Sequence, residues 1–441
     1  MPARRWVGGM QQGLDAIREA RRELDEVIDE IRKIPGYESF LAAPTFEDVA
    51  RAATQQPLVY IAAAELGGLA LVVRGDDVVH IPLPRLTSDV VHERVFAYQR
   101  SYDRSRTDQE AGMRAWKTAL DDTTTWLWDE VMEPVLHELL PAPAAVLVVG
   151  GLLGLLPLHA AWTPDDAAVT RRRHALDALT LTYTPNARSL TAARELASRS
   201  VDTMLAVVGP SPDPLPGILA QARAAASSFP GAATIVEGPE ATPSRVSGAL
   251  GAADVVHFAC HGEADLGTPL DSALELFADS KSQPDDDADG RLRLRDLLAL
   301  PRLDLRLAVL SACETSVPGT ELPDEVVALP TGLLQAGVGG VVASLWRVPE
   351  PPTTRLMIEF YRRWRWEQVP PATALREAQQ WLRDTTNGTK VQWYEQALAS
   401  GAGWLPGDTA GSVMSDLYLL EPDVREDAGL DAWAAFTFVG A

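Results

Sequence analysis

Residues 255–262 read VVHFACHG and residues 307–315 read LAVLSACET, and these two stretches decide the fold that we expect. Each starts as a continuous apolar run, as is typical of a buried parallel strand. The first run ends in His261-Gly262 and the second in Cys313. Both cysteines of the chain, Cys260 and Cys313, lie in these stretches. Each predicted strand therefore ends in side chains that can do chemistry.

Strand-like and helix-like segments alternate from about residue 200 onward. We expect strands at 204–208, 233–236, 254–259, 305–311 and 340–345, and helices at 218–229, 242–250, 330–336, 356–366 and 372–383. Strands that alternate with helices of this length predict a mostly parallel sheet with helices on both faces. The predicted fold class is α/β.

The first 200 residues contain further strands and a long helical region. We expect antiparallel strands at 58–63, 69–74 and 78–83, a helical pattern from 89 to 140, and strands at 145–149 and 179–183. Residues 13–34 have apolar positions at helical spacing and a charged opposite face. This helix either packs on its own domain or serves as a docking helix for a partner.

Composition limits the classes of function. The chain has 441 residues, of which 46% are apolar, so a large core is expected. The formal net charge of −22 disfavours a nucleic-acid partner, because an acidic surface repels phosphate. We see no signal peptide and no apolar run long enough to span a bilayer, and two cysteines do not form a disulfide scaffold. We expect a soluble, cytoplasmic protein without membrane contact.

The two strand ends predict a catalytic dyad. Ligands of open α/β sheets bind at the carboxyl ends of the strands, so His261 and Cys313 meet if their strands are neighbours. A cysteine nucleophile needs a base close by, and an imidazole can take its proton near neutral pH. Gly262 lets the backbone approach a substrate carbonyl, so the N–H groups of Gly262 and Cys313 could form an oxyanion hole. We expect a cysteine peptidase that needs no cofactor.

The same motifs resemble the CHAT peptidase family, a bacterial caspase-like family related to caspases, metacaspases and separase. Further matching motifs are VLVVGGLLGLLPLHAAW, LTYTPNARSL, LQAGVGGVVASLWRV and DAWAAFTFVGA, and the resemblance runs from about residue 45 to the C-terminus. It implies a caspase-type fold that cleaves proteins, with the dyad at His261 and Cys313. It further implies an N-terminal helical segment (1–44), a degenerate caspase-like half (45–200) and a catalytic half (201–441). No TPR array is present, so an activating sensor would be a separate protein acting in trans, and the expected role is a latent bacterial regulatory or defence protease.

Several other readings stay open. His257 and Cys260 compete with the dyad residues, but packing roles are favoured for both. The loop at 278–290 could be cleaved during activation, and it contains a D-x-D-x-D-G run whose Asp285, Asp287 and Asp289 form a weak calcium candidate. The acidic residues near the motif ends are candidates for binding a basic P1 side chain: Glu263, Asp265, Asp324 and Glu325. A non-catalytic caspase-like scaffold is the main alternative function, and a nucleotide-binding protein is disfavoured by the glycine spacing at 150–154.

Overall fold

A computed structural model describes most of the chain. The described residues are 19–35, 37, 44–108, 110–210, 216–265, 267–279, 289–311 and 328–441. They fall into two compact units, 1–48 and 49–441, and the second contains the sheet and the candidate site. In the first unit, a helix covers residues 19–31, within the predicted range 13–34. Its large apolar side chains Leu24 and Val27 are more than half exposed.

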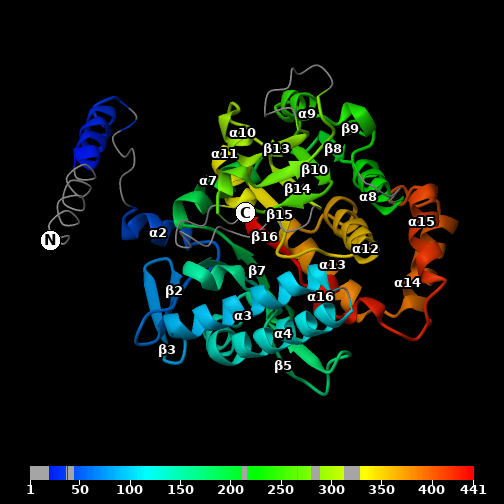
Figure 1. The fold of residues 1–441 in the computed structure, drawn as a ribbon, viewed down its shortest axis with the longest axis horizontal. Helices are drawn as coiled ribbons and strands as arrows, with labels where there is room; N and C mark the ends of the chain where they lie inside the picture. Colours follow the sequence, from blue (N-terminus) through cyan, green and yellow to red (C-terminus); the bar gives the residue numbers. More distant parts are fainter. Residues whose placement is uncertain are drawn as a thin grey trace, which may run out of the picture. The chain divides into compact units, whose positions relative to one another are not determined.

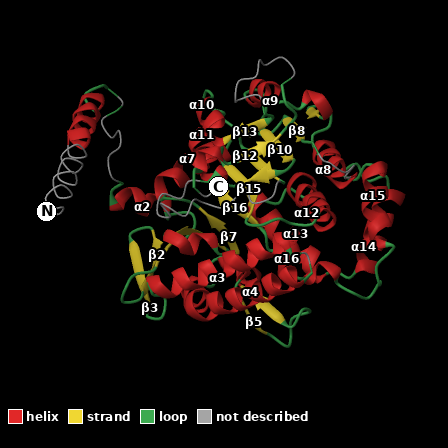
Figure 2. Ribbon diagram, in the orientation of Figure 1, coloured by secondary structure: helices red, strands yellow, loops and turns green. Residues whose placement is uncertain are grey.

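The strands and helices of the second unit are shown in Figures 1 and 2. The strands are β1 (Leu58–Ala62), β2 (Gly68–Arg74), β3 (Asp77–Leu83), β4 (Ala144–Val149), β5 (Trp162–Pro164), β6 (Arg172–His174), β7 (Thr180–Tyr183), β8 (Met204–Val208), β9 (Ala233–Val236), β10 (Val255–Ala259), β11 (Gly262–Glu263), β12 (Ala273–Glu275), β13 (Arg291–Arg293), β14 (Leu307–Leu310), β15 (Gly340–Ser344) and β16 (Phe436–Gly440). The helices are α2 (Phe46–Ala52), α3 (Ser88–Thr107), α4 (Ala111–Leu127), α5 (Glu133–Leu139), α6 (Ala175–Ala178), α7 (Ala187–Ala197), α8 (Pro216–Ser227), α9 (Pro243–Leu250), α10 (Leu294–Ala299), α11 (Leu329–Ala336), α12 (Glu350–Tyr361), α13 (Pro371–Asp384), α14 (Asn387–Ala399), α15 (Gly407–Leu417) and α16 (Leu430–Trp433).

One sheet of 11 strands runs through this unit in the order β3-β2-β1-β4-β7-β16-β15-β14-β10-β8-β9. Seven of its ten neighbouring pairs are parallel, so the predicted mostly parallel sheet is confirmed. The antiparallel pairs are β1–β2, β2–β3 and, in the middle, β15–β16. The β15–β16 pair reverses the strand direction, so the carboxyl ends of β4 and β7 lie at the opposite edge of the sheet from those of β10 and β14.

Side chains of β8, β10 and β14 alternate between two cores. Met204, Val255 and Val309 belong to the core that includes residues of α8, α12 and α13. Val256 and Leu310 belong to the core that includes residues of α9, α10 and α11. A strand points successive side chains to opposite faces, so burial on both faces explains why these strands are continuously apolar.

The predicted elements after residue 55 agree with the structure to within a few residues, except that α12 starts six residues before the predicted 356 and continues as a π-helical turn to residue 366. Thr242 caps α9 by accepting a hydrogen bond from the Arg245 amide, as its place before a proline suggested. Sequence reasoning missed α14, α15 and the strand β16. None of the helices in the described ranges has the length and apolar character needed to cross a bilayer.

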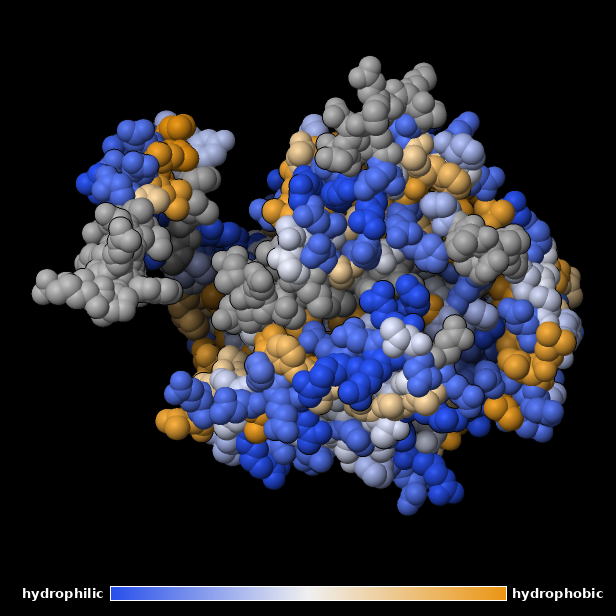
Figure 3. Space-filling model, in the orientation of Figure 1, coloured by the Kyte–Doolittle hydropathy of each residue, from blue (hydrophilic) through white to orange (hydrophobic). Residues whose placement is uncertain are grey.

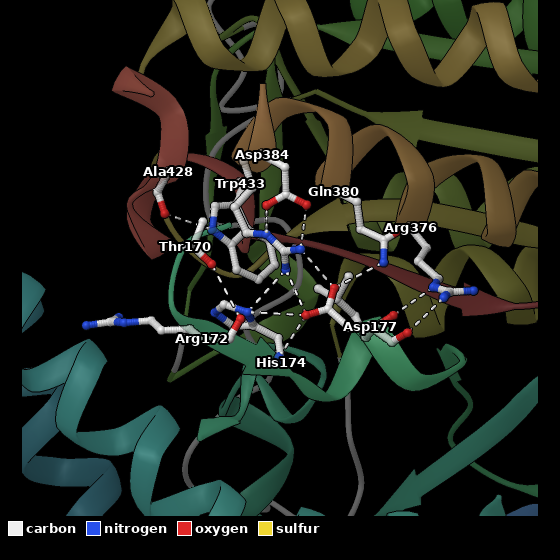
Figure 4. Close-up of polar contacts among 11 residues, drawn as sticks. Thr170, Arg172, His174, Asp177, Arg376, Gln380, Asp384, Ala428 and Trp433 are labelled. Carbon is white, nitrogen blue, oxygen red and sulfur yellow. Dashed lines mark hydrogen bonds and ion pairs between the residues drawn. The ribbon is translucent and has the colours of Figure 1, made fainter. Parts of the chain in front are cut away.

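A partly buried ionic cluster joins α13 to the segment that contains β6 and α6 (Figure 4). Arg383 donates to both carboxylate oxygens of Asp177, at 3.2 and 2.9 Å, and also pairs with Asp384. Burial would raise the pKa of Asp177, but hydrogen bonds from His174 and Arg383 and the Arg383 charge hold it well below its ordinary value. Asp177 is therefore ionised in the folded protein, and the cluster stabilises the packing of α13 on this part of the chain.

Most of the surface visible in Figure 3 is hydrophilic, with hydrophobic groups distributed among polar residues. The mixed surface agrees with the 23% of charged residues in the sequence.

Candidate active site

The strands that carry the predicted dyad are neighbours. β10 and β14 pair in parallel, with Val255 opposite Leu307 and Phe258 opposite Leu310. The Ser311 amide donates to the Phe258 carbonyl at 2.9 Å, so the pairing continues one residue past β14. The carboxyl ends of the two strands therefore lie side by side, as the proposed dyad requires.

His261 lies two residues beyond β10 and is half-buried. Its Nε2 is shielded from solvent and has no hydrogen-bond partner among the described residues. A buried polar atom normally has a partner, so this nitrogen is open to a group that approaches it during a reaction. Cys313 lies outside the described residues, and the described part of its strand ends at Ser311.

The backbone after His261 turns into a small second sheet of β11, β12 and β13. The Glu275 amide donates to the His261 carbonyl at 2.9 Å, and Gly262 lies opposite Leu274. Hydrogen-bonded and non-hydrogen-bonded pairs alternate along an antiparallel ladder, so the Gly262 N–H is directed away from β12. This N–H therefore has no partner on β12, which the oxyanion-hole hypothesis requires.

The two competitors of the dyad are buried in the core. His257 is fully buried, and its Nδ1 lies 3.1 Å from the hydroxyl of Tyr361 on α12, while its Nε2, like that of His261, has no hydrogen-bond partner among the described residues. Burial lowers the pKa of His257 to about 3, so this imidazole stays neutral inside the core. Cys260 is 4% exposed and belongs to the core that covers the other face of the sheet. Gly209 at the end of β8 allows this packing, because a Cβ there would lie 2.4 Å from the Cβ of Cys260.

The two described acidic candidates for binding a basic P1 side chain, Glu263 and Asp265, take part in separate local interactions. Glu263 is exposed and pairs with Arg291 at 2.6 Å. Asp265 accepts hydrogen bonds from the amides of Gly267 and Thr268, which stabilises its own turn. Asp324 and Glu325 lie outside the described residues.

The calcium candidate has little support in the described part of the loop. Asp289 pairs with Arg293 at 2.5 Å and accepts a hydrogen bond from the Arg291 amide. Cationic partners of this kind compete with a metal ion. Asp285 and Asp287 lie outside the described residues, and in the described ranges no group of three or more His, Cys, Asp or Glu side chains could hold a metal ion.

Sequence reasoning missed a polar network beside Ser311. The Ser311 hydroxyl donates to the side-chain oxygen of Gln221, whose Nε2 donates to the hydroxyl of Thr354. Glu350, in the run that follows Leu345-Trp346, accepts a hydrogen bond from the Gly217 amide. The sequence places Gln221 in a predicted helix, but a single Gln within a helix pattern does not reveal which strand it faces.

The fold and the paired strand ends define an α/β protein with a mostly parallel sheet, whose candidate site lies at the carboxyl ends of β10 and β14. Among solved structures, a Saccharomyces cerevisiae separase–securin complex is similar with a TM-score of 0.50 and 9% identity over 80% of this chain, which corresponds to 32% of the separase chain. The Arg-specific cysteine proteinase gingipain R matches with a TM-score of 0.37 and 11% identity, over 80% of this chain and 74% of its own.

The sequence comparison identifies the family. The family model of the CHAT domain matches residues 121–441, which is more than half of the chain, so the chain belongs to the CHAT domain family. The resemblance drawn from the sequence motifs is thereby confirmed, although residues 45–120 lie outside the matched range. A search of curated protein sequences gave no match.

Proposed function

We propose that this protein is a cysteine endopeptidase with His261 as the base and Cys313 as the nucleophile. The observation that carries the proposal is the register of the two strands. Phe258 of β10 lies opposite Leu310 of β14. His261 lies three positions after Phe258, and Cys313 lies three positions after Leu310. The open Nε2 of His261 and the direction of the Gly262 N–H give further support.

The proposed reaction follows the acyl-transfer scheme of a thiol nucleophile. His261 takes the thiol proton, and the Cys313 sulfur attacks the scissile carbonyl carbon. The N–H groups of Gly262 and Cys313 stabilise the oxyanion. The C–N bond then breaks as the imidazolium protonates the leaving amine. Water hydrolyses the thioester, which releases the acid product and restores the thiol.

Substrate, regulation and organisation form the finer part of the proposal. The substrate is a protein with a P1 side chain that Glu263, Asp265, Asp324 or Glu325 can contact if it is basic. The strand order supports a division into residues 45–200 as a degenerate half and 201–441 as the catalytic half, with 1–44 as a separate helical segment, because β1 to β4 and β7 lie together on one side of the strands that follow residue 201. A latent cytoplasmic regulatory or defence protease of bacteria, activated by a sensor in trans, is the proposed context. Cleavage of the 278–290 loop is a proposed activation step.

A peptide library tests the activity. The purified protein and its Cys313→Ala variant are incubated with peptides that carry basic, acidic or apolar P1 residues, and the products are identified by mass spectrometry. Cys260→Ser is the matched control, because Cys260 is the other cysteine and packs in the core. Cleavage by the parent and Cys260→Ser proteins, and none by Cys313→Ala, is expected.

Equal cleavage by the Cys313→Ala variant would refute the role of Cys313. The second candidate function is a non-catalytic caspase-like scaffold. It would be favoured if none of the proteins cleaves a peptide and the Cys313 thiol reacts with an alkylating probe no faster than an ordinary thiol.

A further inference from the structure

The end of β14 is held by a buried amide on a neighbouring helix. The Ser311 hydroxyl donates to Gln221 Oε1 at 2.5 Å. Gln221 lies on α8 and is only 3% exposed. Its Nε2 donates to the hydroxyl of Thr354 on α12 at 3.0 Å. One side chain therefore connects the last described residue before Cys313 to two helices.

A second contact fixes these helices against each other. The Gly217 amide at the start of α8 donates to Glu350 Oε1 at the start of α12, at 2.5 Å. Gly217 lies one turn before Gln221, and Glu350 one turn before Thr354, so both contacts join the same pair of helix faces. A Cβ on Gly217 would lie 2.2 Å from Glu350 Oε1, so a larger residue there would displace the Glu350 carboxylate from this contact. Gln221 is therefore presented to Ser311 from a defined position.

Apolar residues of the same two helices pack together. Ala222 and Ala225 of α8 belong to the same core as Leu356 and Phe360 of α12. A contact between the two helices alone would need only the amide nitrogen and Thr354. The amide oxygen instead accepts from Ser311, two residues before Cys313 in the chain. A buried amide group that loses a hydrogen-bond partner costs free energy. The bond to Thr354 therefore fixes the Gln221 side chain, and the bond from the Ser311 hydroxyl favours a single position of Ser311.

We infer that Gln221 is a positioning residue, which fixes Ser311 and thereby the direction in which the chain leaves β14 toward Cys313. The inference rests on the proposed function, because it assigns to Gln221 the alignment of the Cys313 thiol with His261. Loss of this alignment lowers the thiolate fraction near neutral pH, since the thiolate depends on a nearby base.

The test measures the pH dependence of Cys313 alkylation by iodoacetamide, with the Cys313 peptide quantified by mass spectrometry. Gln221→Met removes both hydrogen bonds at nearly constant volume. We expect its alkylation rate at pH 7 to fall about tenfold and its midpoint to move toward the ordinary thiol value of about 8.5. Thr354→Val should shift the profile in the same direction, whereas Thr354→Ser retains the hydroxyl and should behave as the parent. Ser311→Ala combined with Gln221→Met should be no slower than Gln221→Met alone.

Gln379→Met is the matched control. Gln379 is also a buried helical glutamine, 4% exposed, and it donates to the carbonyls of Trp433 and Phe436. Its substitution should lower the melting temperature without moving the alkylation profile. An unchanged profile in Gln221→Met, or an equal shift in Gln379→Met at equal loss of stability, would overturn the positioning role alone. A parent thiol that titrates near 8.5, together with cleavage that persists in Cys313→Ala, would overturn the proposed function and this inference with it.

Discussion

Replacement of Asp427 by asparagine should destabilise the protein strongly, because Asp427 compensates two buried cations. Its carboxylate accepts hydrogen bonds from Arg355 at 3.0 and 2.8 Å and from Lys390 at 2.7 Å. Arg355 and Asp427 are each 2% exposed, and Lys390 is fully buried. Two cationic side chains therefore face this carboxylate, and burial lowers the pKa of Lys390.

The expected magnitude follows from this charge count. Asp427→Asn leaves two buried cations without a counter-charge, and breaking a buried pair in this way costs about 3–5 kcal/mol. Lys390→Met removes one of the two cations and leaves a neutral Arg355–Asp427 pair. It loses the hydrogen bonds to the Leu382 carbonyl and to Asp427, but it also removes the cost of burying the Lys390 charge, so we expect a net loss of about 1–2 kcal/mol. We therefore expect Lys390→Met to cost at least about 1 kcal/mol less than Asp427→Asn, which is the smallest difference between these two ranges.

Urea unfolding followed by tryptophan fluorescence provides the assay, because the chain has 12 tryptophans. Burial would raise the pKa of Asp427, but the charges of Arg355 and Lys390 outweigh it and lower this pKa. A depressed pKa stabilises the fold above the unfolded value of about 4 and loses this effect as the pH falls through the folded value. The stability gap between the parent and Asp427→Asn should therefore persist from pH 5 to 8 and shrink in acid. Equal losses for Asp427→Asn and Lys390→Met would refute the charge argument.

Three further outcomes are expected at the candidate site. His261→Ala should slow alkylation of Cys313 at pH 7 about tenfold, and the difference should vanish well above pH 8.5, where any thiol ionises; an unchanged rate at pH 7 would exclude His261 as the base. Gly209→Ala should lower stability by about 1–3 kcal/mol in thermal or urea unfolding, because the new Cβ overlaps the side chain of Cys260, and a neutral substitution would show that β8 can shift freely. Millimolar calcium should change the melting temperature of neither the parent nor Asp289→Asn, because Asp289 already pairs with two arginines. A rise in the melting temperature with calcium that is seen only in the parent would support the calcium site.

The sequence indicates least clearly where the CHAT domain begins. We expected the family resemblance to begin at about residue 45, whereas the matched range starts at residue 121. In the structure, β1, β2 and β3 nevertheless belong to the same sheet as the site strands. Backbone hydrogen bonding between β1 and β4 joins them, and the sequence carries little information about such pairing between distant segments.

The sequence by itself determined the strands β10 and β14 and the reactive residues that follow them. Apolar runs such as 255–259 and 307–310 predict buried strands because their composition suits burial on both faces, whatever lies beside them. Helix limits such as that of α9 were also predictable, since Thr242 and Pro243 act on their own backbone. These are local effects of a residue on its immediate chain neighbours.

Only the tertiary structure decided which strands are neighbours and in which direction they run. The strand β16 enters between β7 and β15 from the far end of the chain and reverses the strand direction, although its sequence does not reveal a partner. Gln221 likewise looks like any polar helix residue until α8 and α12 bring it to Ser311. Both features depend on contacts between segments separated by tens to hundreds of residues. The pattern of apolar positions specifies that a segment is buried, but the packing of the whole sheet specifies what buries it.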